Sequence, residues 1–287
     1  MSIVRRIGEG APVATPLELH LSGPRLRRAF EHLVESAEGS GGIERYVSGL
    51  ALKSSLFEEV LGKGRVGELS EAEFLDLCAF ITPVRRRIAE WLSQYGFLRM
   101  RALLVDLLHG WSDVHTVDAR MADFVAGVGA DKRFRWSRDL AAEVLHFVAP
   151  ERYPLMTRWI WDANVGTGVL REIWFADDVD RARIDVPDSY ATFALLREEL
   201  DGFLAANGVF RDQAYYADLI AAHVYGNYIN DRGGQYLQSD FARNAHDPIA
   251  HTRRLLGLDA IDSETGRTRL KLVDGTAHVV QPPKQLS

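Results

Sequence analysis

The residues best suited to chemistry lie between Tyr215 and Tyr236, where tyrosine, asparagine, aspartate and arginine gather around a single histidine. Their spacing places His223, Asn227 and Asn230 on one face of a predicted helix. Polar side chains within an otherwise apolar helix must find hydrogen-bond partners. They form either a buried network that fixes packing or the lining of a ligand pocket or partner groove. The candidate residues for binding a ligand or partner are Asp162, His223, Tyr225, Asn227, Asp231 and Arg232.

The same region offers groups for catalysis. His223, Asp231 and Arg232 would serve a small-molecule enzyme if they converge on one concave pocket. The sequence contains no Walker A loop, no Gly-x-Ser-x-Gly elbow and no His-Glu-x-x-His pair. The sequence therefore leaves open whether the chain is an enzyme, and no residue is assigned a catalytic role.

Two histidine clusters contain metal-ligand side chains without a recognised metal-binding spacing. His109, Asp113 and His115 are separated by a glycine that ends a predicted helix, and the second cluster, 246–251, lacks an orienting third group. Cys78 is the only cysteine, so no disulfide and no cysteine-based zinc or iron–sulfur site can form within the chain. We expect no metal site and no cofactor.

The elements that position these residues are predicted to be helices. The chain has 287 residues, of which 47% are hydrophobic and 26% charged, as in an ordinary globular protein. Apolar residues recur at spacings of three and four, and no strand alternation is visible in the first 260 residues. Helices are predicted over 24–38, 43–61, from Ser70 onward with a capping-box spacing, and over 82–109, 117–126, 137–148, 153–162, 188–206, 211–229 and 248–256.

The C-terminal tail is the exception to this helical pattern. Residues 268–273 and 276–280 flank Asp274-Gly275, a dipeptide that favours a type I′ hairpin turn. The sequence predicts a mainly α protein with one compact multi-helix domain over residues 23–260. An irregular segment, 1–22, precedes this domain, and a small β-hairpin with a tail, 261–287, follows it.

Residues 124–156 contain a Gly-Val-Gly turn between two helical stretches, and a Pro-containing turn at 150–154 follows. This segment resembles the helix–hairpin–helix region of the DNA glycosylase superfamily, in which backbone amides of the glycine turn hold a DNA phosphate. The resemblance implies an all-helical fold and a basic cleft completed by Arg158, although the same loop could be a solvated basic surface. The implied phosphate- or DNA-binding residues are Gly127, Gly129, Lys132, Arg133, Arg135 and Arg138.

The segment differs from the family at the positions on which the family's phosphate binding and catalysis depend. Residues 133–136 intervene between the glycine turn and the second helix, so the turn is longer than in the family. The position of the family's catalytic aspartate falls near Thr157, and the nearest acid, Asp162, lies about one and a half helical turns further on. We therefore do not expect glycosylase chemistry.

Charge and composition set the remaining expectations. The net charge is -6, unlike the basic charge of a typical nucleic-acid coat. No signal-peptide core or membrane-length apolar stretch occurs, so we expect a cytoplasmic protein without membrane contact. We predict a non-catalytic helical accessory or regulatory protein that binds another protein through aromatic and arginine surfaces, including the concentration of Trp159, Trp161, Trp174 and Phe175. The alternatives are a DNA-binding or DNA-repair-related protein with a degenerate helix–hairpin–helix fold, and a small-molecule enzyme.

Overall fold

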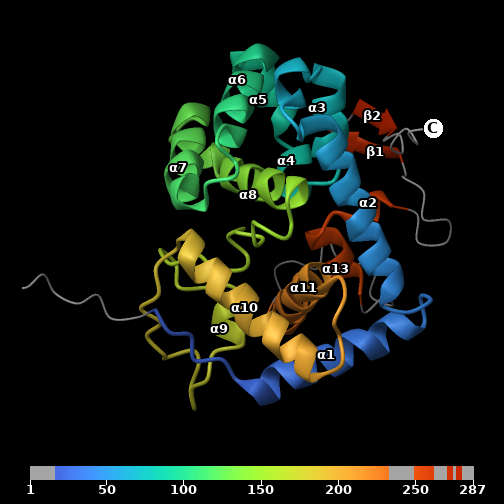
Figure 1. Cartoon of the computed structure of the whole chain (residues 1–287), viewed down its shortest axis with the longest axis vertical. Coiled ribbons are helices and arrows are strands. Elements are labelled where there is room, and N and C mark those ends of the chain that lie inside the picture. The colour runs from blue at the N-terminus through green and yellow to red at the C-terminus, as the bar shows by residue number, and fades with distance from the viewer. Residues whose placement is uncertain (1–16, 233–248, 262–269, 274–275, 280–287) are drawn as a thin grey trace, which may run out of the picture.

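The computed structural model describes residues 17–232, 249–261, 270–273 and 276–279 (Figure 1). Helices dominate this part of the chain, so the predicted mainly α fold is confirmed. Their bounds are α1 Gly23–Glu38, α2 Glu44–Leu61, α3 Glu71–Cys78, α4 Thr82–Arg85, α5 Ile88–Tyr95, α6 Phe97–Leu108, α7 Val117–Val128, α8 Trp136–Val148, α9 Val169–Glu172, α10 Tyr190–Ala206, α11 Gln213–Arg232 and α13 Ala250–Leu255.

Two helices organise the arrangement. Helices α3 to α8 lie together in one part of the molecule, and α1, α9, α10 and α11 lie together in the other, with α2 running alongside (Figure 1). Helix α8 packs against α2, α4 and α7, and α11 packs against α1, α2, α9, α10 and α13. Buried apolar side chains from both parts, among them Leu33, Leu50, Phe147 and Trp161, belong to one continuous core. Among the described residues, no helix is long and apolar enough to cross a membrane.

A local signal explains where α3 begins. The hydroxyl of Ser70 accepts a hydrogen bond from the amide of Glu73 at 3.3 Å, and the Glu73 carboxylate accepts from the Ser70 amide at 2.9 Å. This reciprocal pair is the predicted capping box, which satisfies two amides that the first turn of α3 leaves unpaired.

Two helix predictions are wrong. The predicted helix over 82–109 is divided into α4, α5 and α6, because Arg87 has non-helical backbone angles and Gly96 has a φ of 82° that ends α5. The predicted helix over 153–162 is absent. Pro154 lacks an amide hydrogen and disfavours helix in the residue before it. The carbonyls of Trp159 and Ile160 instead accept hydrogen bonds from residues 169 and 170 at 3.1 Å each.

The ends of the chain are described only in part. Strands β1 Leu270–Val273 and β2 Thr276–Val279 pair antiparallel, with residue 270 opposite 279. The predicted turn at 274–275 lies outside the described residues, as does the first part of the predicted irregular segment, 1–16. The rest of that segment contacts the core, since the amide of Ser22 donates to the carbonyl of Ile173 at 2.8 Å.

Candidate ligand-binding pocket

A pocket of about 400 Å³ opens where α4, α8, α11 and α13 meet the loop that follows α8. Helix α4 contributes Thr82, α8 contributes Asp139 and α11 contributes Tyr225, while α13 contributes His251 and Arg254. Arg158, Trp159, Asp162 and Thr167 of the loop complete the wall. This volume and the mixture of aromatic, apolar and charged groups are typical of sites that bind small organic molecules.

The apolar surface of the pocket is built around two aromatic rings. The centroids of Trp159 and Tyr225 are 6.0 Å apart, with their planes inclined by 38°. Ile229 and Leu255 add aliphatic surface beside them. Because an aromatic ring presents a flat apolar face, this wall can hold a planar ligand by stacking.

The ion pair between Asp139 and Arg158 lies in the same pocket. The Arg158 Nη2 donates to the Asp139 carboxylate at 2.8 Å, and the backbone amide of Arg158 donates to its other oxygen at 3.3 Å. Burial alone would lower the pKa of Arg158, but the hydrogen bond and charge of Asp139 outweigh burial and raise it. The guanidinium is therefore a permanent, pre-oriented hydrogen-bond donor.

A second carboxylate, that of Asp162, is held by its own loop. Its Oδ1 accepts from the amides of Asn164 and Val165 at 3.1 and 3.3 Å, and its backbone amide donates to the carbonyl of Thr167 at 3.0 Å. Asp162 is close enough to Arg158 to influence the guanidinium electrostatically. The loop thus fixes an acceptor group at the edge of the pocket.

The phenol of Tyr225 remains protonated at neutral pH. Burial, followed by the neighbouring Tyr228, raises its pKa above the ordinary value of 10.0. A neutral phenol can either donate or accept a hydrogen bond, so Tyr225 offers a polar edge as well as an aromatic face.

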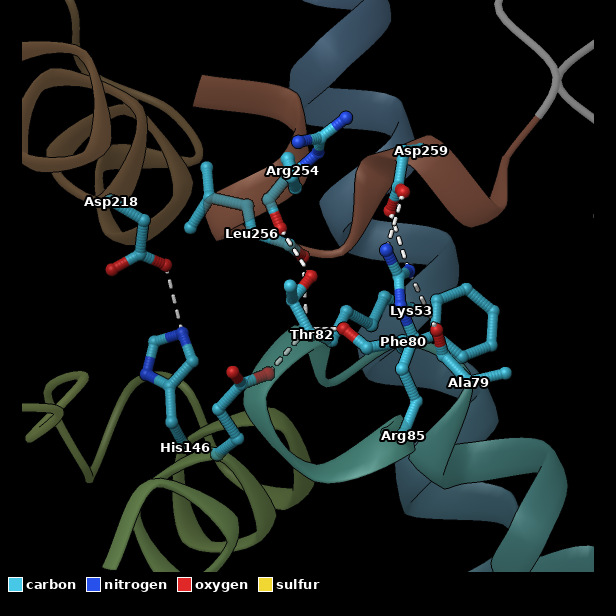
Figure 2. Close-up of polar contacts among 11 residues, drawn as sticks. Lys53, Ala79, Phe80, Thr82, Arg85, His146, Asp218, Arg254, Leu256 and Asp259 are labelled. Carbon is cyan, nitrogen blue, oxygen red and sulfur yellow. Dashed lines mark hydrogen bonds and ion pairs between the residues drawn. The ribbon is translucent and has the colours of Figure 1, made fainter. Parts of the chain in front are cut away.

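Figure 2 shows how the α13 side of the pocket is fastened to the rest of the fold. The hydroxyl of Thr82 donates to the carbonyl of Arg254 at 2.6 Å. The ammonium of Lys53 donates to the carbonyl of Leu256 at 2.9 Å. Just beyond, the guanidinium of Arg85 forms two hydrogen bonds with the carboxylate of Asp259, at 3.1 and 2.9 Å. These contacts join α13 to α2 and α4, so the wall that carries Arg254 is fixed.

The structure brings together two of the predicted ligand-binding residues, Asp162 and Tyr225, and separates two others from them. His223 is fully buried, and its Nε2 lies 2.8 Å from the Nδ1 of His32 on α1. The Asn227 amide nitrogen lies 3.4 Å from the same His32 nitrogen. The predicted polar face of α11 therefore contacts α1 at these two residues, whereas Tyr225 lines the pocket.

The enzyme alternative groups His223 with Asp231 and Arg232. The side chains of Asp231 and Arg232 lie outside the part of the chain that is described. A pocket formed by His223 with these two residues stays a prediction.

The glycine turn of the resembling segment differs from a simple Gly-x-Gly hairpin. Gly127 lies inside the last turn of α7, and a Cβ there would come within 2.3 Å of the Leu103 side chain. Gly127 therefore permits close packing of α7 on α6. Only Gly129, with a φ of 131°, lies in the turn itself.

Two of the four basic residues predicted to bind phosphate, Arg133 and Arg138, are paired with carboxylates of the chain itself. The carboxylate of Asp131 accepts from the backbone amide of Arg133 at 2.8 Å and from its Nε at 3.0 Å. Arg138 forms an ion pair with Asp188, while Lys132 and Arg135 are exposed. Because Asp131 occupies an amide that a phosphate would use, the loop is less suited to phosphate than the resemblance implies. Its DNA-binding role stays a prediction.

The predicted aromatic interaction surface is divided among different environments. Trp161 and Trp174 are buried in the core, Trp159 lines the pocket, and Phe175 is 69% exposed. The sequence did not point to three of the other pocket residues, which come from helices far apart along the chain: Thr82, Asp139 and Arg254. His251, noted in the second histidine cluster, lies in the same pocket. Binding of a protein partner stays a prediction.

Comparison with known proteins identifies no relative of this chain. No protein-family model matches the chain, and neither the curated proteins nor the solved structures contain a significant match. Within the described residues, no group of three or more histidine, cysteine, aspartate or glutamate side chains forms a metal cluster. His109 and His115 accordingly form no such cluster.

Proposed function

We propose that the chain is a small-molecule-binding protein whose ligand is a neutral, planar heterocycle of the size of a nucleobase or nucleoside. The observation that carries this proposal is the Trp159–Tyr225 wall beside the Asp139–Arg158 ion pair, which puts a stacking surface next to fixed hydrogen-bonding groups. Stacking supplies affinity and the polar groups supply orientation.

The charges of the pocket favour a neutral ligand. Two carboxylates, Asp139 and Asp162, are matched by two guanidiniums, Arg158 and Arg254. A phosphate or a free cation would therefore meet one attractive and one repulsive group in the same small volume. A ring that carries both N–H donors and carbonyl acceptors can satisfy both kinds of group.

The resemblance of residues 124–156 to DNA glycosylases supports a base as the ligand. Such a base could come from either of two sources. The base is either a free molecule or part of a nucleic acid that presents it unstacked. The Asp131 carboxylate already accepts hydrogen bonds from the amide and the Nε of Arg133, groups that a DNA phosphate would need. This favours the free molecule as the ligand. Binding of a nucleic acid is the second outcome of the same experiment.

Isothermal titration calorimetry with the five common nucleobases and their nucleosides tests the proposal. We expect at least one to bind the full chain with a Kd below about 100 µM. Replacing Trp159 or Tyr225 with alanine should weaken binding at least about tenfold, as loss of one base-stacking ring does elsewhere. Phe175→Ala is the matched control, since its ring is exposed and lies outside the pocket.

Two results would overturn the proposal. One is the absence of heat for every ring compound, and the other is unchanged binding in Trp159→Ala and Tyr225→Ala. A short single-stranded oligonucleotide serves as a parallel ligand. Tighter binding of the oligonucleotide than of the free base, with a steep dependence on salt, would assign the pocket to nucleic acid.

A further inference from the structure

Two histidines from different helices meet outside the pocket lining. The Nδ1 of His32 on α1 and the Nε2 of His223 on α11 are 2.8 Å apart, and their ring planes are inclined by 40°. The side-chain amide of Asn227, one turn further along α11, lies 3.4 Å from the same His32 nitrogen. Rotation of an amide by 180° exchanges its nitrogen and oxygen, so Asn227 can also present its oxygen there. Three potential donor atoms therefore converge from two helices.

The buried member of the pair is prepared to coordinate a cation. The Nδ1 of His223 lies 3.2 Å from the hydroxyl of Thr252 on α13. A hydrogen bond at the second ring nitrogen fixes the tautomer and orientation of metal-binding histidines. With its Nδ1–H directed at Thr252, its Nε2 lone pair faces His32.

We propose that His32, His223 and Asn227 form a site for one late first-row divalent cation, such as Zn²⁺, between α1 and α11. Imidazole is a preferred ligand of these ions, and water would fill the remaining positions. The proton now shared by the ring nitrogens moves to the Nε2 of His32, so both facing lone pairs are free and no net proton is released. This proposal is independent of the ligand pocket.

The required movement is small. Metal–nitrogen bonds of about 2.0–2.1 Å at a tetrahedral centre place two nitrogens about 3.3 Å apart. The rings must therefore separate by about half an ångström and also tilt until both lone pairs point at one ion. The exposed side chain of His32 can provide most of this movement. The three groups include no carboxylate to offset the dication, so we expect micromolar rather than nanomolar affinity.

Competition with a chromophoric chelator, using the full chain without a polyhistidine tag, measures the site directly. We expect one equivalent of Zn²⁺ to bind, and His32→Ala to weaken it at least about tenfold. His32→Ala alters an exposed side chain, so the fold should persist, as circular dichroism can verify. His115→Ala removes another exposed histidine and should leave binding unchanged.

Two further measurements separate a metal site from a simple hydrogen-bonded pair. Asn227→Asp adds a carboxylate and should tighten Zn²⁺ binding, whereas a hydrogen-bonded pair gives no such gain. Co²⁺ should give visible absorption bands of a nitrogen-ligated ion that His32→Ala abolishes. Zn²⁺ binding to His32→Ala as tight as to the unaltered chain, or equal losses in His32→Ala and His115→Ala, would overturn the proposal.

Discussion

Lys53 and Glu143 form an ion pair inside the core, with Nζ and Oε2 separated by 2.6 Å and the two side chains 0% and 3% exposed. The ammonium also donates to the carbonyls of Phe80 and Leu256 and lies 3.9 Å from the centroid of the Phe147 ring. Burial lowers the pKa of Lys53 and raises the pKa of Glu143, while their mutual attraction opposes both shifts. One side chain of α2 thus connects α8, the residues before α4 and the end of α13.

This geometry predicts strong coupling between the two residues. Lys53→Met should destabilise the fold by about 3–5 kcal/mol, because it leaves the Glu143 carboxylate buried without a cation. The double variant Lys53→Met/Glu143→Leu should cost less than the sum of the two single changes, since no uncompensated charge remains. Urea unfolding of the four proteins at pH 7 measures the coupling. Additive effects would show that the pair does not act as a unit.

The backbone conformation of Gly257 leads to a second prediction about stability. Its φ is 71°, and a Cβ at this position would lie 1.7 Å from the Phe80 carbonyl oxygen. Gly257→Ala should therefore lose about 1–2 kcal/mol for the left-handed backbone alone, and more for displacing that carbonyl. The matched control is Gly202→Ala in α10, where a Cβ meets nothing within 4 Å and helix propensity should gain up to about 1 kcal/mol. Thermal melts should shift in opposite directions, and equal shifts would contradict this account.

Much of the fold was predictable because helices repeat their apolar face locally. Helices α10 and α11 lie close to the predicted ranges 188–206 and 211–229. The exceptions are places where the backbone changes direction without losing apolar residues. Gly96 divides a stretch in which apolar residues recur on both sides of the break, and most of residues 153–161 are buried without forming a helix. Periodicity records burial, so it cannot distinguish a buried loop from a buried helix.

The candidate site was less predictable, because its contacts join residues far apart in the sequence. Composition drew attention to Asp162 and Tyr225, which do share the pocket. It gave no indication that Thr82 would bond to Arg254, 172 residues away, or that His32 would meet His223 across 191 residues. Such pairs follow from how helices pack, and helix packing is not encoded in the spacing along one segment.

The loop of the resembling segment allows the DNA-binding alternative to be tested. The backbone amide of Arg133, and then its side chain, lower the pKa of Asp131, so this carboxylate is charged at neutral pH and repels phosphate. If the loop contacts DNA, Asp131→Ala should strengthen binding to duplex DNA severalfold, with the gain lost at higher salt. Fluorescence anisotropy at two salt concentrations measures the effect. The triple variant Lys132→Ala/Arg133→Ala/Arg135→Ala should remove any binding, and unchanged affinity in both variants would exclude this loop as a DNA contact.

The ionisation of Tyr225 yields a prediction for the pocket itself. Because burial raises the pKa of Tyr225 above 10.0, its phenol keeps its proton at neutral and mildly alkaline pH. The affinity for a heterocycle that does not itself titrate in this range should therefore be constant and fall only at higher pH. Tyr225→Phe preserves the stacking face and removes one hydrogen bond, so it should weaken binding by about two- to tenfold at every pH. Calorimetric titrations at several pH values test this directly. A drop in affinity with a midpoint below pH 10, present in the unaltered chain and absent in Tyr225→Phe, would show that the phenol is less buried than its packing indicates.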